Sequence, residues 1–304
     1  MNRPLLTIFS TPKPFTKPHI NLIQSNALKS WINLGTEVEV LLIGKEEGVD
    51  EAARHLNIRF FPEVQRNSLG TPLISSMFAV ARKNSSSPFL AIVNTDVILL
   101  PDCLSTLKIA AQKFKKFVLA GQRWDLAVNG QLEFLSGYDV DLIRRVKEYG
   151  RRHPPMGSDY FIFPRECYLD IPDFAIGRAG WDNWMLFKSR FEGWPLIDAS
   201  SAVTAIHQDH DYSHLADGQP HYHLPESKQN VLLAGGECSI FTLSDATHYL
   251  TDARLQPKKI TLKRIWREIE IMPLTKWHSL KIGRFFYYLF HPKKAYAFLR
   301  SHLF

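Results

Sequence analysis

Four short groups of polar residues could carry chemistry in this chain, and each lies beside a run of apolar residues. The first group is Asn94, Thr95 and Asp96, which interrupts the apolar run from Pro88 to Leu100. A carboxylate at the end of a buried strand is costly unless a cation, a hydrogen-bond donor or a ligand compensates it. Asp96 is therefore a candidate for binding a metal or a nucleotide. The same three residues are also typical of a solvated β-turn.

The second group is Gly157, Ser158 and Asp159, which stands directly before the apolar run Tyr160–Phe163. Asp159 would project from the start of a buried strand. Two interpretations stay open, because an aspartate in this place either faces a ligand or stabilises a turn.

The third group places Asp182 between Trp181 and Trp184. Large aromatic rings stack on sugars and exclude water. Desolvation would raise the pKa of Asp182 and make it a better general base. The alternative is that Asp182 is the N-cap of a helix that starts at Asn183, because aspartate is a favoured cap.

The fourth group is the histidine-rich segment that begins at His207 and continues with Gln208 and Asp209. It is not a zinc motif, because no cysteine stands nearby to complete one. One histidine at the end of a strand could add a nitrogen ligand to an oxygen-rich site, and that combination favours Mn²⁺ over Mg²⁺. The histidines at 210, 214, 221 and 223 are expected in a polar loop.

The elements that must position these groups alternate regularly along the first hundred residues. Apolar runs predict strands at 5–9, 37–43, 58–61 and 88–100, and periodic apolar residues predict helices at 19–34, 50–56 and 73–83. This alternation is typical of a parallel sheet flanked by helices, in which ligands bind beyond the carboxyl ends of the strands. Further strands are expected at 117–123, 160–163, 196–199 and 203–207, the last two as a pair, and helices at 140–149 and 183–190.

Length and composition favour one large domain or two smaller ones, because the chain has 304 residues and 45% of them are hydrophobic. Its three cysteines are widely spaced, which favours a reducing compartment, so we expect a cytoplasmic protein. We expect no membrane-spanning segment, because no stretch of about 18 apolar residues occurs. Glycine-rich dinucleotide, Walker-type and nucleophile-elbow motifs are absent, which disfavours dinucleotide oxidoreductases, P-loop enzymes and serine hydrolases.

The net charge of +7 is concentrated at the C-terminal end of the chain. Residues 251–304 contain twelve lysines and arginines against three acidic residues, whereas the remainder is slightly acidic. The same segment is rich in Trp, Tyr and Phe, and that mixture suits the headgroup layer of an anionic membrane. The alternatives are that the aromatic residues pack on the body of the protein, or that the partner is nucleic acid, which we do not expect.

In the order of these groups the chain resembles the GT-A-fold glycosyltransferases, a superfamily of nucleotide-diphospho-sugar transferases, and especially family 2. Asn94-Thr95-Asp96 matches the DxD-like step, Trp181-Asp182 the acidic position before a helix, and His207 the histidine after a late strand. The resemblance covers residues 1–245. It implies an α/β fold with a Rossmann-type mixed sheet flanked by helices, and it leaves a basic, aromatic, mainly helical extension at 246–304.

The resemblance implies a nucleotide-binding half at 1–102 and an acceptor half at 103–245. It further implies a divalent ion, Mn²⁺ or Mg²⁺, held by Asp96 and His207, with Asp182 as the base of an inverting transfer. The donor would be a nucleotide sugar and the acceptor a hydroxyl of a glycan or lipid-linked glycan, at the inner face of the membrane. Residues expected at the donor are Phe9, Ser10, Thr11, Arg66, Asn67, Asn94, Thr95 and Arg123, and those expected at the acceptor are Asp159, Trp181 and Trp184.

Two positions depart from the family pattern. Asn94 stands where the first acid of the DxD motif is usual, and Trp181 precedes Asp182 where glutamate is common. A catalytically degenerate protein that binds glycans or nucleotides is therefore an alternative. A sugar-1-phosphate nucleotidyltransferase ranks lower, because the segment from Ser10 to Pro14 lacks the glycines of that class.

Overall fold

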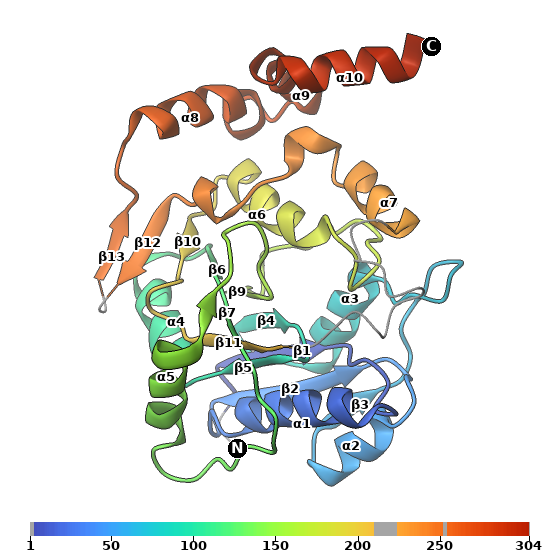
Figure 1. The fold of residues 1–304 in the computed structure, drawn as a ribbon, viewed down its shortest axis with the longest axis vertical. Helices are drawn as coiled ribbons and strands as arrows, with labels where there is room; N and C mark the ends of the chain where they lie inside the picture. The colour runs from blue at the N-terminus through green and yellow to red at the C-terminus, as the bar shows by residue number, and fades with distance from the viewer. Residues whose placement is uncertain (1–2, 210–223, 252–253, 304) are drawn as a thin grey trace.

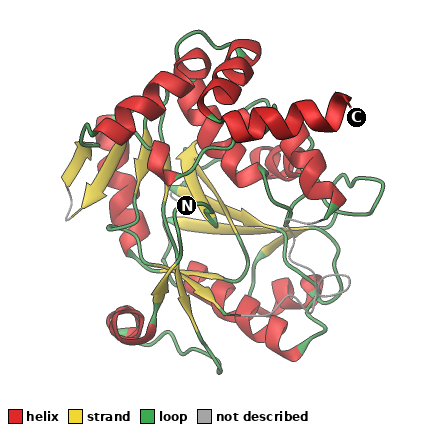
Figure 2. Ribbon diagram, turned by 45° about the horizontal axis from the view of Figure 1, so that its top comes forward, coloured by secondary structure: helices red, strands yellow, loops and turns green. Residues whose placement is uncertain are grey.

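Two β-sheets organise the chain in the computed structural model, which describes residues 3–209, 224–251 and 254–303. In spatial order the larger sheet contains β13 (Arg254–Pro257), β12 (His248–Thr251), β10 (Leu196–Asp198), β6 (Val118–Ala120), β9 (Tyr160–Pro164), β4 (Phe89–Val93), β1 (Leu6–Ser10), β2 (Val38–Ile43) and β3 (Arg59–Phe61). The smaller sheet contains β5 (Val97–Leu99), β11 (Ala205–Gln208), β7 (Trp124–Leu126) and β8 (Arg151–Arg152). Figure 2 shows the strands of both sheets in yellow.

Helices surround the sheets (Figure 1). They are α1 (Pro18–Ile32), α2 (Val49–His55), α3 (Ile74–Asn84), α4 (Asp102–Lys113), α5 (Tyr138–Tyr149), α6 (Trp181–Phe191), α7 (Pro225–Leu233), α8 (Leu262–Thr275), α9 (Leu280–Phe290) and α10 (Pro292–Leu303). Two 3₁₀ turns, Glu237–Ser239 and Leu243–Asp245, precede β12. The expectation of a mixed sheet flanked by helices is confirmed.

The end of the larger sheet formed by β4, β1, β2 and β3 is parallel, as the alternation of strands and helices predicts. β4, β1, β2 and β3 run in one direction, and β9 runs antiparallel between β4 and β6. β1 is buried along its whole length because helices cover both faces of the sheet, so its sequence shows no polar alternation. Its side chains still alternate between two cores, since Ile8 packs on one face and Phe9 on the other.

Each face of the larger sheet has its own set of helices. Phe9, Phe78 of α3 and Phe161 of β9 belong to one core, which also receives α6 and part of α8. Trp31 of α1 and Leu107 of α4 belong to the core on the opposite face. A third, smaller core joins α5 to the smaller sheet.

The chain crosses between the two sheets at four short segments, and this corrects two expectations. The apolar run 88–100 is not one strand, because β4 belongs to the larger sheet and β5 to the smaller one. Likewise 196–199 and 203–207 are not paired, because β10 and β11 lie in different sheets. These short crossings are 94–96, 121–123, 153–159 and 199–204, and a longer one runs from β5 through α4 to β6. Backbone that leaves a sheet in this way can present polar side chains between the sheets.

The C-terminal segment begins as sheet and ends as helices. β12 pairs parallel with β10 and antiparallel with β13, so residues 248–257 extend the larger sheet rather than standing apart from it. Helices α8, α9 and α10 follow and lie together at one end of the molecule (Figure 1). No helix among the described residues is long and apolar enough to cross a bilayer.

Candidate active site

The crossing at Asn94–Asp96 is a tight turn that also holds a buried carboxylate. The backbone N–H of Val97 donates to the carbonyl of Asn94 at 3.0 Å, which closes the turn. Asp96 is 8% exposed, and its Oδ2 lies 3.3 Å from Nζ of Lys13. The segment is therefore both a turn and a place for a buried carboxylate, because the turn fixes the backbone and the ion pair with Lys13 compensates the charge of Asp96.

Asp159 lies against this turn and links it to the second crossing. Nδ2 of Asn94 donates to Asp159 Oδ1 at 2.7 Å, and Nη1 of Arg123 donates to Asp159 Oδ2 at 2.5 Å. A carboxylate at position 94 would meet Asp159 as a like charge, whereas the amide of Asn94 donates a hydrogen bond to it. The departure from the DxD pattern therefore has a local physical reason. Asp159 accepts hydrogen bonds from Asn94 and Arg123, and its role at an acceptor stays a prediction.

Asp125 and His207 face each other across neighbouring strands of the smaller sheet. They are register partners on the parallel strands β7 and β11, and Asp125 Oδ1 lies 3.2 Å from His207 Nδ1. Nε of Arg123 donates to the same oxygen at 2.8 Å, and His153 Nδ1 lies 3.2 Å from Asp125 Oδ2. Burial alone would raise the pKa of Asp125, but His207 and Arg123 outweigh it and hold that pKa well below its usual range.

The pKa of His207 moves in the complementary direction. Burial lowers it, but the Asp125 carboxylate and the charge of Asp96 outweigh burial, so the pKa of His207 lies above its ordinary value. Asp96 is thus within electrostatic reach of the histidine. The backbone of Gln208 confirms the proximity, because its N–H donates to the carbonyl of Asp96 at 3.2 Å.

Three side chains form a group that could hold a metal ion. Asp125, His207 and Asp209 each offer one ligand atom, and these atoms lie within 4.8 Å of one another. His207 and Asp209 are two residues apart, so both project from the same side of an extended segment. Asp209 also pairs with Arg151 at 3.1 Å. Two carboxylates and one imidazole are a donor set that suits Mn²⁺, so the residues fit the implied ion.

This group includes His207, whose role as a metal ligand stays a prediction, but it does not include Asp96. Asp96 lies beside the group and adds a third carboxylate charge near its two aspartates, and its role as a ligand stays a prediction. The presence of Arg123 and Arg151 at two of the carboxylates keeps the group balanced in charge.

Asp182 lies close to the same region, because the charge of Asp159 affects its pKa. It lies in the first turn of α6, which begins after Gly180, a glycine with a φ of 106°. Burial is the main cause that raises the pKa of Asp182 to about 6, and the charge of Asp159 adds to it. The helix starts at Trp181, so Asp182 is not the N-cap.

Gly157 shows how close Asp182 lies to the group of candidate metal ligands. A Cβ atom at Gly157 would lie 3.7 Å from Asp182 Oδ2 and 4.0 Å from His153 Nε2. His153 in turn contacts Asp125 through its other ring nitrogen. Gly157 therefore separates a carboxyl group of raised pKa from the candidate metal ligands, in a segment where the chain crosses between the sheets.

The two tryptophans beside Asp182 are core residues, which corrects the expectation that their faces hold an acceptor. Trp181 is 5% exposed and Trp184 is 6% exposed. Trp181 packs on Phe161 with ring centroids 5.7 Å apart, and Trp184 packs on Phe174 at 5.2 Å. Large apolar rings at the start of α6 anchor the helix on the sheet, and this packing positions Asp182.

The three residues expected at the nucleotide near the end of β1, Phe9, Ser10 and Thr11, have different surroundings. Phe9 is fully buried and packs edge-on against Phe78 at 5.0 Å, so its expected place at the donor is wrong for the side chain. Ser10 is buried and donates to the carbonyl of Val93 at 2.5 Å. Thr11 is different, because its hydroxyl has no hydrogen-bond partner among the described residues although it is buried. The carbonyl of Thr11 accepts a hydrogen bond of 3.5 Å from Thr95.

Arg66 and Asn67 lie on a loop near the carboxyl end of β2. Nη2 of Arg66 pairs with Glu46 at 2.8 Å, and Glu46 and Thr11 meet around Gly44. Nδ2 of Asn67 donates to Glu226 of α7 at 2.5 Å. Both residues thus border the ends of β1 and β2, and their contact with a nucleotide stays a prediction.

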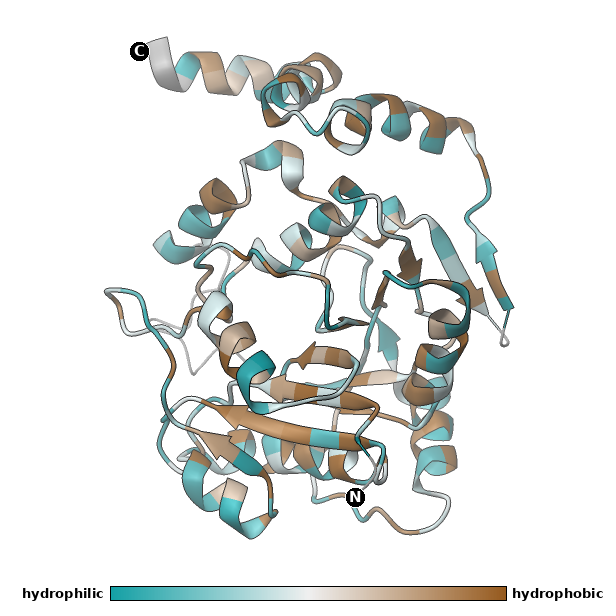
Figure 3. Ribbon diagram, turned by 180° about the vertical axis from the view of Figure 1, so that it is seen from behind, coloured by the Kyte–Doolittle hydropathy of each residue, from teal (hydrophilic) through white to brown (hydrophobic). Residues whose placement is uncertain are grey.

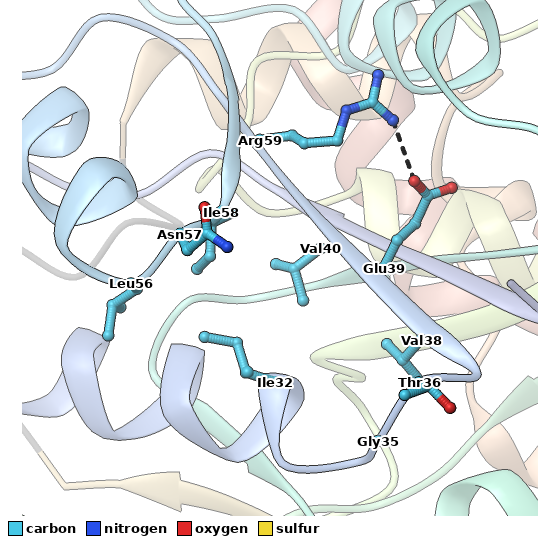
Figure 4. A pocket seen from close by; sticks show the side chains of 10 residues that line it. All are labelled: Ile32, Gly35, Thr36, Val38, Glu39, Val40, Leu56, Asn57, Ile58 and Arg59. Atoms are coloured by element: carbon cyan, nitrogen blue, oxygen red, sulfur yellow. Dashed lines mark hydrogen bonds and ion pairs between the residues drawn. The ribbon is translucent and has the colours of Figure 1, made fainter. Parts of the chain in front are cut away.

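A cavity of about 440 Å³ lies elsewhere on the larger sheet (Figure 4). It is lined mainly by apolar side chains such as Ile32 and Val40, with an ion pair between Arg59 and Glu39 at its border. It lies at the amino end of β2, whereas Asp125 and His207 lie on β7 and β11 of the smaller sheet. It is therefore not part of the candidate site.

Sequence reasoning missed Lys13, Asp125, His153 and Asp209 as site residues. A signal for Asp209 was present, because residues two apart in an extended segment share one side, and His207 had already been singled out. Asp125 carried the same signal, because it is two residues from Arg123, which was expected at the donor. Lys13 and His153 carried no such signal, since only the three-dimensional fold brings their segments to Asp96 and Asp125. The histidines at 210, 214, 221 and 223 lie outside the described residues.

Comparison with known proteins finds similar solved structures but no matching family model and no matching curated protein. A mannosyltransferase from Pyrobaculum calidifontis in complex with GDP-Man and Mn²⁺ has 14% identity and a TM-score of 0.43, over 67% of this chain and 57% of that one. TarS 1–349 from S. aureus in complex with UDP-GlcNAc has 16% identity and a TM-score of 0.42, over 69% and 61%. Glucosyl-3-phosphoglycerate synthase from Mycobacterium tuberculosis, in complex with Mn²⁺, UDP and glucosyl-3-phosphoglycerate, has 13% identity and a TM-score of 0.47, over 86% and 89%.

The first of these proteins is a mannosyltransferase, and all three were solved with a nucleotide or a nucleotide sugar, in two cases together with Mn²⁺. The chain spans about three fifths of the length of the first two. At such low identity and TM-score, a shared activity does not follow from the likeness.

Proposed function

We propose that this protein transfers a sugar from a nucleoside-diphosphate sugar to a hydroxyl group, and that a divalent metal ion takes part. The observation that carries the proposal is the pairing of two unlike centres at the junction of the sheets. One is the oxygen- and nitrogen-donor group of Asp125, His207 and Asp209. The other is Asp182, a carboxyl group whose pKa is raised to about 6.

The first centre suits the leaving group. Departure of a nucleoside diphosphate from a sugar leaves negative charge on phosphate oxygens, and catalysis requires that this charge be stabilised. Asp125, His207 and Asp209 would hold the metal ion, which supplies positive charge next to the diphosphate when bound. Lys13, Arg123 and Arg151 add cationic side chains around the same place.

Asp182 suits the acceptor. With a pKa of about 6 it is mostly ionised at neutral pH and still basic enough to take a proton from a hydroxyl. In an inverting transfer the acceptor oxygen bonds to the anomeric carbon while the bond from that carbon to the diphosphate breaks. The proton of the acceptor hydroxyl passes to Asp182, so the charges balance.

The donor nucleotide would lie beyond the ends of β1 and β2, where Thr11, Arg66 and Asn67 stand. The hydroxyl of Thr11 supports this place, because a buried hydroxyl without a partner among the described residues can be satisfied by a ligand. Asn94 and Arg123 would act through Asp159, which both of them bind. Ligands of open α/β sheets bind at this edge.

The acceptor we propose is a glycan or a lipid-linked glycan. The basic and aromatic segment after residue 251 supports this choice, because such a segment could bring the protein to an anionic membrane surface where lipid-linked acceptors reside.

Calorimetric titration with UDP, GDP, dTDP and CMP, each with and without Mn²⁺, tests the proposal. We expect one nucleoside diphosphate to bind only when Mn²⁺ is present, and Asp125→Asn to weaken that binding by about tenfold or more. Asp141→Asn is the matched control, because Asp141 is an exposed aspartate of α5. Binding of no nucleotide under either condition would contradict the proposal. Binding without any turnover of a nucleotide sugar would favour a non-catalytic protein instead.

A further inference from the structure

Helices α8 and α9 expose a continuous apolar stripe on the surface of the protein. On α8 the exposed residues Leu262, Trp266 and Ile269 follow each other at intervals of four and three, so they share one side of the helix. On α9 the exposed residues Ile282, Phe285 and Leu289 do the same at intervals of three and four. Trp266 is 63% exposed and Phe285 is 65% exposed. We call these six residues the tail face.

Aromatic contacts join the two halves of the tail face. The rings of Trp266 and Phe290 lie 6.0 Å apart, those of Phe286 and Phe290 lie 6.5 Å apart, and Phe285 lies 6.1 Å from Phe286. The chain of rings connects α8 to α9, so both stripes form a single surface. Figure 3 shows apolar segments on these helices at the end of the molecule that is remote from β1, β2 and β3.

The other side of α8 is fixed to the body of the protein. Ile271 and Leu274 are buried in the core that contains α6. Arg267 of α8 pairs with Asp245 at 2.7 Å, and Arg190 of α6 pairs with Glu268 at 2.7 Å. The helix therefore buries one apolar stripe against the protein and presents a second one outward, which its own fold does not require.

Positive charge surrounds the tail face. Lys263, Lys276 and Lys281 are exposed and form no ion pair with any described residue. After residue 253 the sequence contains two acidic residues, Glu268 and Glu270, and both form ion pairs with arginines. The outward surface of these helices is thus apolar at its centre and cationic at its border.

We propose that the tail face lies on an anionic phospholipid bilayer, with the rings of Trp266 and Phe285 at the level of the headgroups and acyl chains. An amphipathic helix with aromatic residues on one side and lysines around it binds such a surface in the plane of the interface. The lysines attract anionic headgroups. A second copy of this chain is a poorer occupant, because docking two tail faces would bring lysines of equal charge together.

This inference deepens the proposed function, because a lipid-linked acceptor would then be met at the surface to which the protein binds. It rests on that function only for the choice of acceptor. Binding to vesicles needs no nucleotide, and binding of a nucleoside diphosphate with Mn²⁺ needs no vesicle. The two properties can therefore be measured separately in the same protein, and failure of one does not imply failure of the other.

Co-sedimentation of the full chain with vesicles tests the inference. One set of vesicles contains phosphatidylcholine alone, and the other contains phosphatidylcholine and phosphatidylglycerol. We expect binding to the mixed vesicles and at least about tenfold weaker binding of the double variant Trp266→Glu and Phe285→Glu. The matched control is Leu135→Glu and Leu169→Glu, because these leucines are 69% and 75% exposed and lie in loops outside the tail face. The control should bind like the unmodified protein.

A second pair of variants tests the charge. Lys263→Glu with Lys281→Glu should weaken binding to the mixed vesicles by about tenfold or more and leave the weak binding to phosphatidylcholine nearly unchanged. The control is Lys83→Glu with Lys115→Glu, two exposed lysines of the body. Circular dichroism of every variant checks that it is folded.

Three outcomes would overturn the inference. The first is that the unmodified chain does not sediment with the mixed vesicles. The second is that Trp266→Glu with Phe285→Glu and Lys263→Glu with Lys281→Glu both bind as well as their controls. The third is that sedimentation velocity shows a dimer that Trp266→Glu with Phe285→Glu dissociates, without any binding to vesicles, which would identify a second copy as the occupant.

Discussion

Asp125 and His207 are register partners on two parallel strands, and the carboxylate oxygen of the first lies 3.2 Å from the ring nitrogen of the second. Parallel strands β7 and β11 fix this relationship through the backbone, so it does not depend on a flexible loop. Asp209 completes the group two residues beyond His207. The rigidity of the sheet is what would keep three ligand atoms close enough for one ion.

Removal of one carboxylate from this group should weaken metal binding without unfolding the protein. We expect Asp125→Asn to lower the affinity for Mn²⁺ by about 10-fold to 100-fold, because the amide retains the shape but loses the charge. Electron paramagnetic resonance of free Mn²⁺ measures this directly. Asp141→Asn should leave the affinity unchanged, and equal affinity of both variants would show that Asp125 is not a ligand.

Metal binding should also weaken as the pH falls. A histidine must be neutral to bind a metal ion, and the pKa of His207 is raised by Asp125 and Asp96 beyond what burial removes. Protons therefore compete with Mn²⁺ from a higher pH than an ordinary histidine would allow. Titrations of Mn²⁺ at several pH values measure the effect. In His207→Asn the residual affinity should depend less on pH near neutrality, whereas His55→Asn on the exposed helix α2 should behave like the unmodified protein.

The activity should rise with pH around the pKa of Asp182. Because the base acts in its ionised form, we expect the rate of transfer to increase up to a plateau with a midpoint at about 6. Asp182→Asn should lower kcat by about 10²-fold to 10⁴-fold while nucleotide binding with Mn²⁺ stays within about twofold. Loss of nucleotide binding in this variant would instead place Asp182 at the donor.

The same raised pKa predicts that Asp182 lowers the stability of the folded protein at neutral pH. The folded state binds the proton of Asp182 more tightly than the unfolded state, so stability falls as the pH rises from about 4 to about 6. Asp182→Asn should remove this penalty and increase the free energy of unfolding at about pH 8 by up to roughly 3 kcal/mol. Urea unfolding measures it, and the gain should shrink by about half at about pH 5. A variant less stable than the unmodified protein at about pH 8 would show that burial of Asp182 does not cost stability.

Phe9 provides a test of the core assignment at the end of β1. Phe9→Ala should reduce the free energy of unfolding by about 3 to 5 kcal/mol, because a fully buried ring that packs on Phe78 leaves a cavity. Phe9→Leu should cost less and leave nucleotide affinity unchanged. A loss of nucleotide affinity in folded Phe9→Leu would show that Phe9 does contribute to the donor site.

The sequence predicted those parts of the fold that depend on local pattern. Apolar runs located β1, β2, β3 and β9, and helical periodicity located α1, α3 and α5, because each of these elements buries residues at a regular interval. The helix from Asp102 to Lys113 was missed, and the division of 88–100 between two sheets was not foreseen. Sheet membership depends on pairing between distant strands, which no local pattern encodes.

The sequence also indicated only those residues of the candidate site that have a local signal. Asp96, Asp182 and His207 stood out because each is a polar residue next to an apolar run, and the structure brings Asp96 and His207 together. Lys13 and His153 carried no such signal, because only the three-dimensional fold brings their segments to Asp96 and Asp125. Aromatic residues misled the assignment at Phe9, Trp181 and Trp184, because a ring that packs in a core and a ring that stacks on a sugar have the same sequence signature.

The decisive measurement is the release of nucleoside diphosphate from a panel of nucleotide sugars, with and without Mn²⁺. We expect the unmodified protein to release the diphosphate from at least one sugar nucleotide when Mn²⁺ is present. Asp125→Asn should slow this release by at least about tenfold and Asp182→Asn by at least about a hundredfold, with both variants folded. Release that is independent of Mn²⁺, or that persists unchanged in both variants, would rule out the proposed transfer reaction.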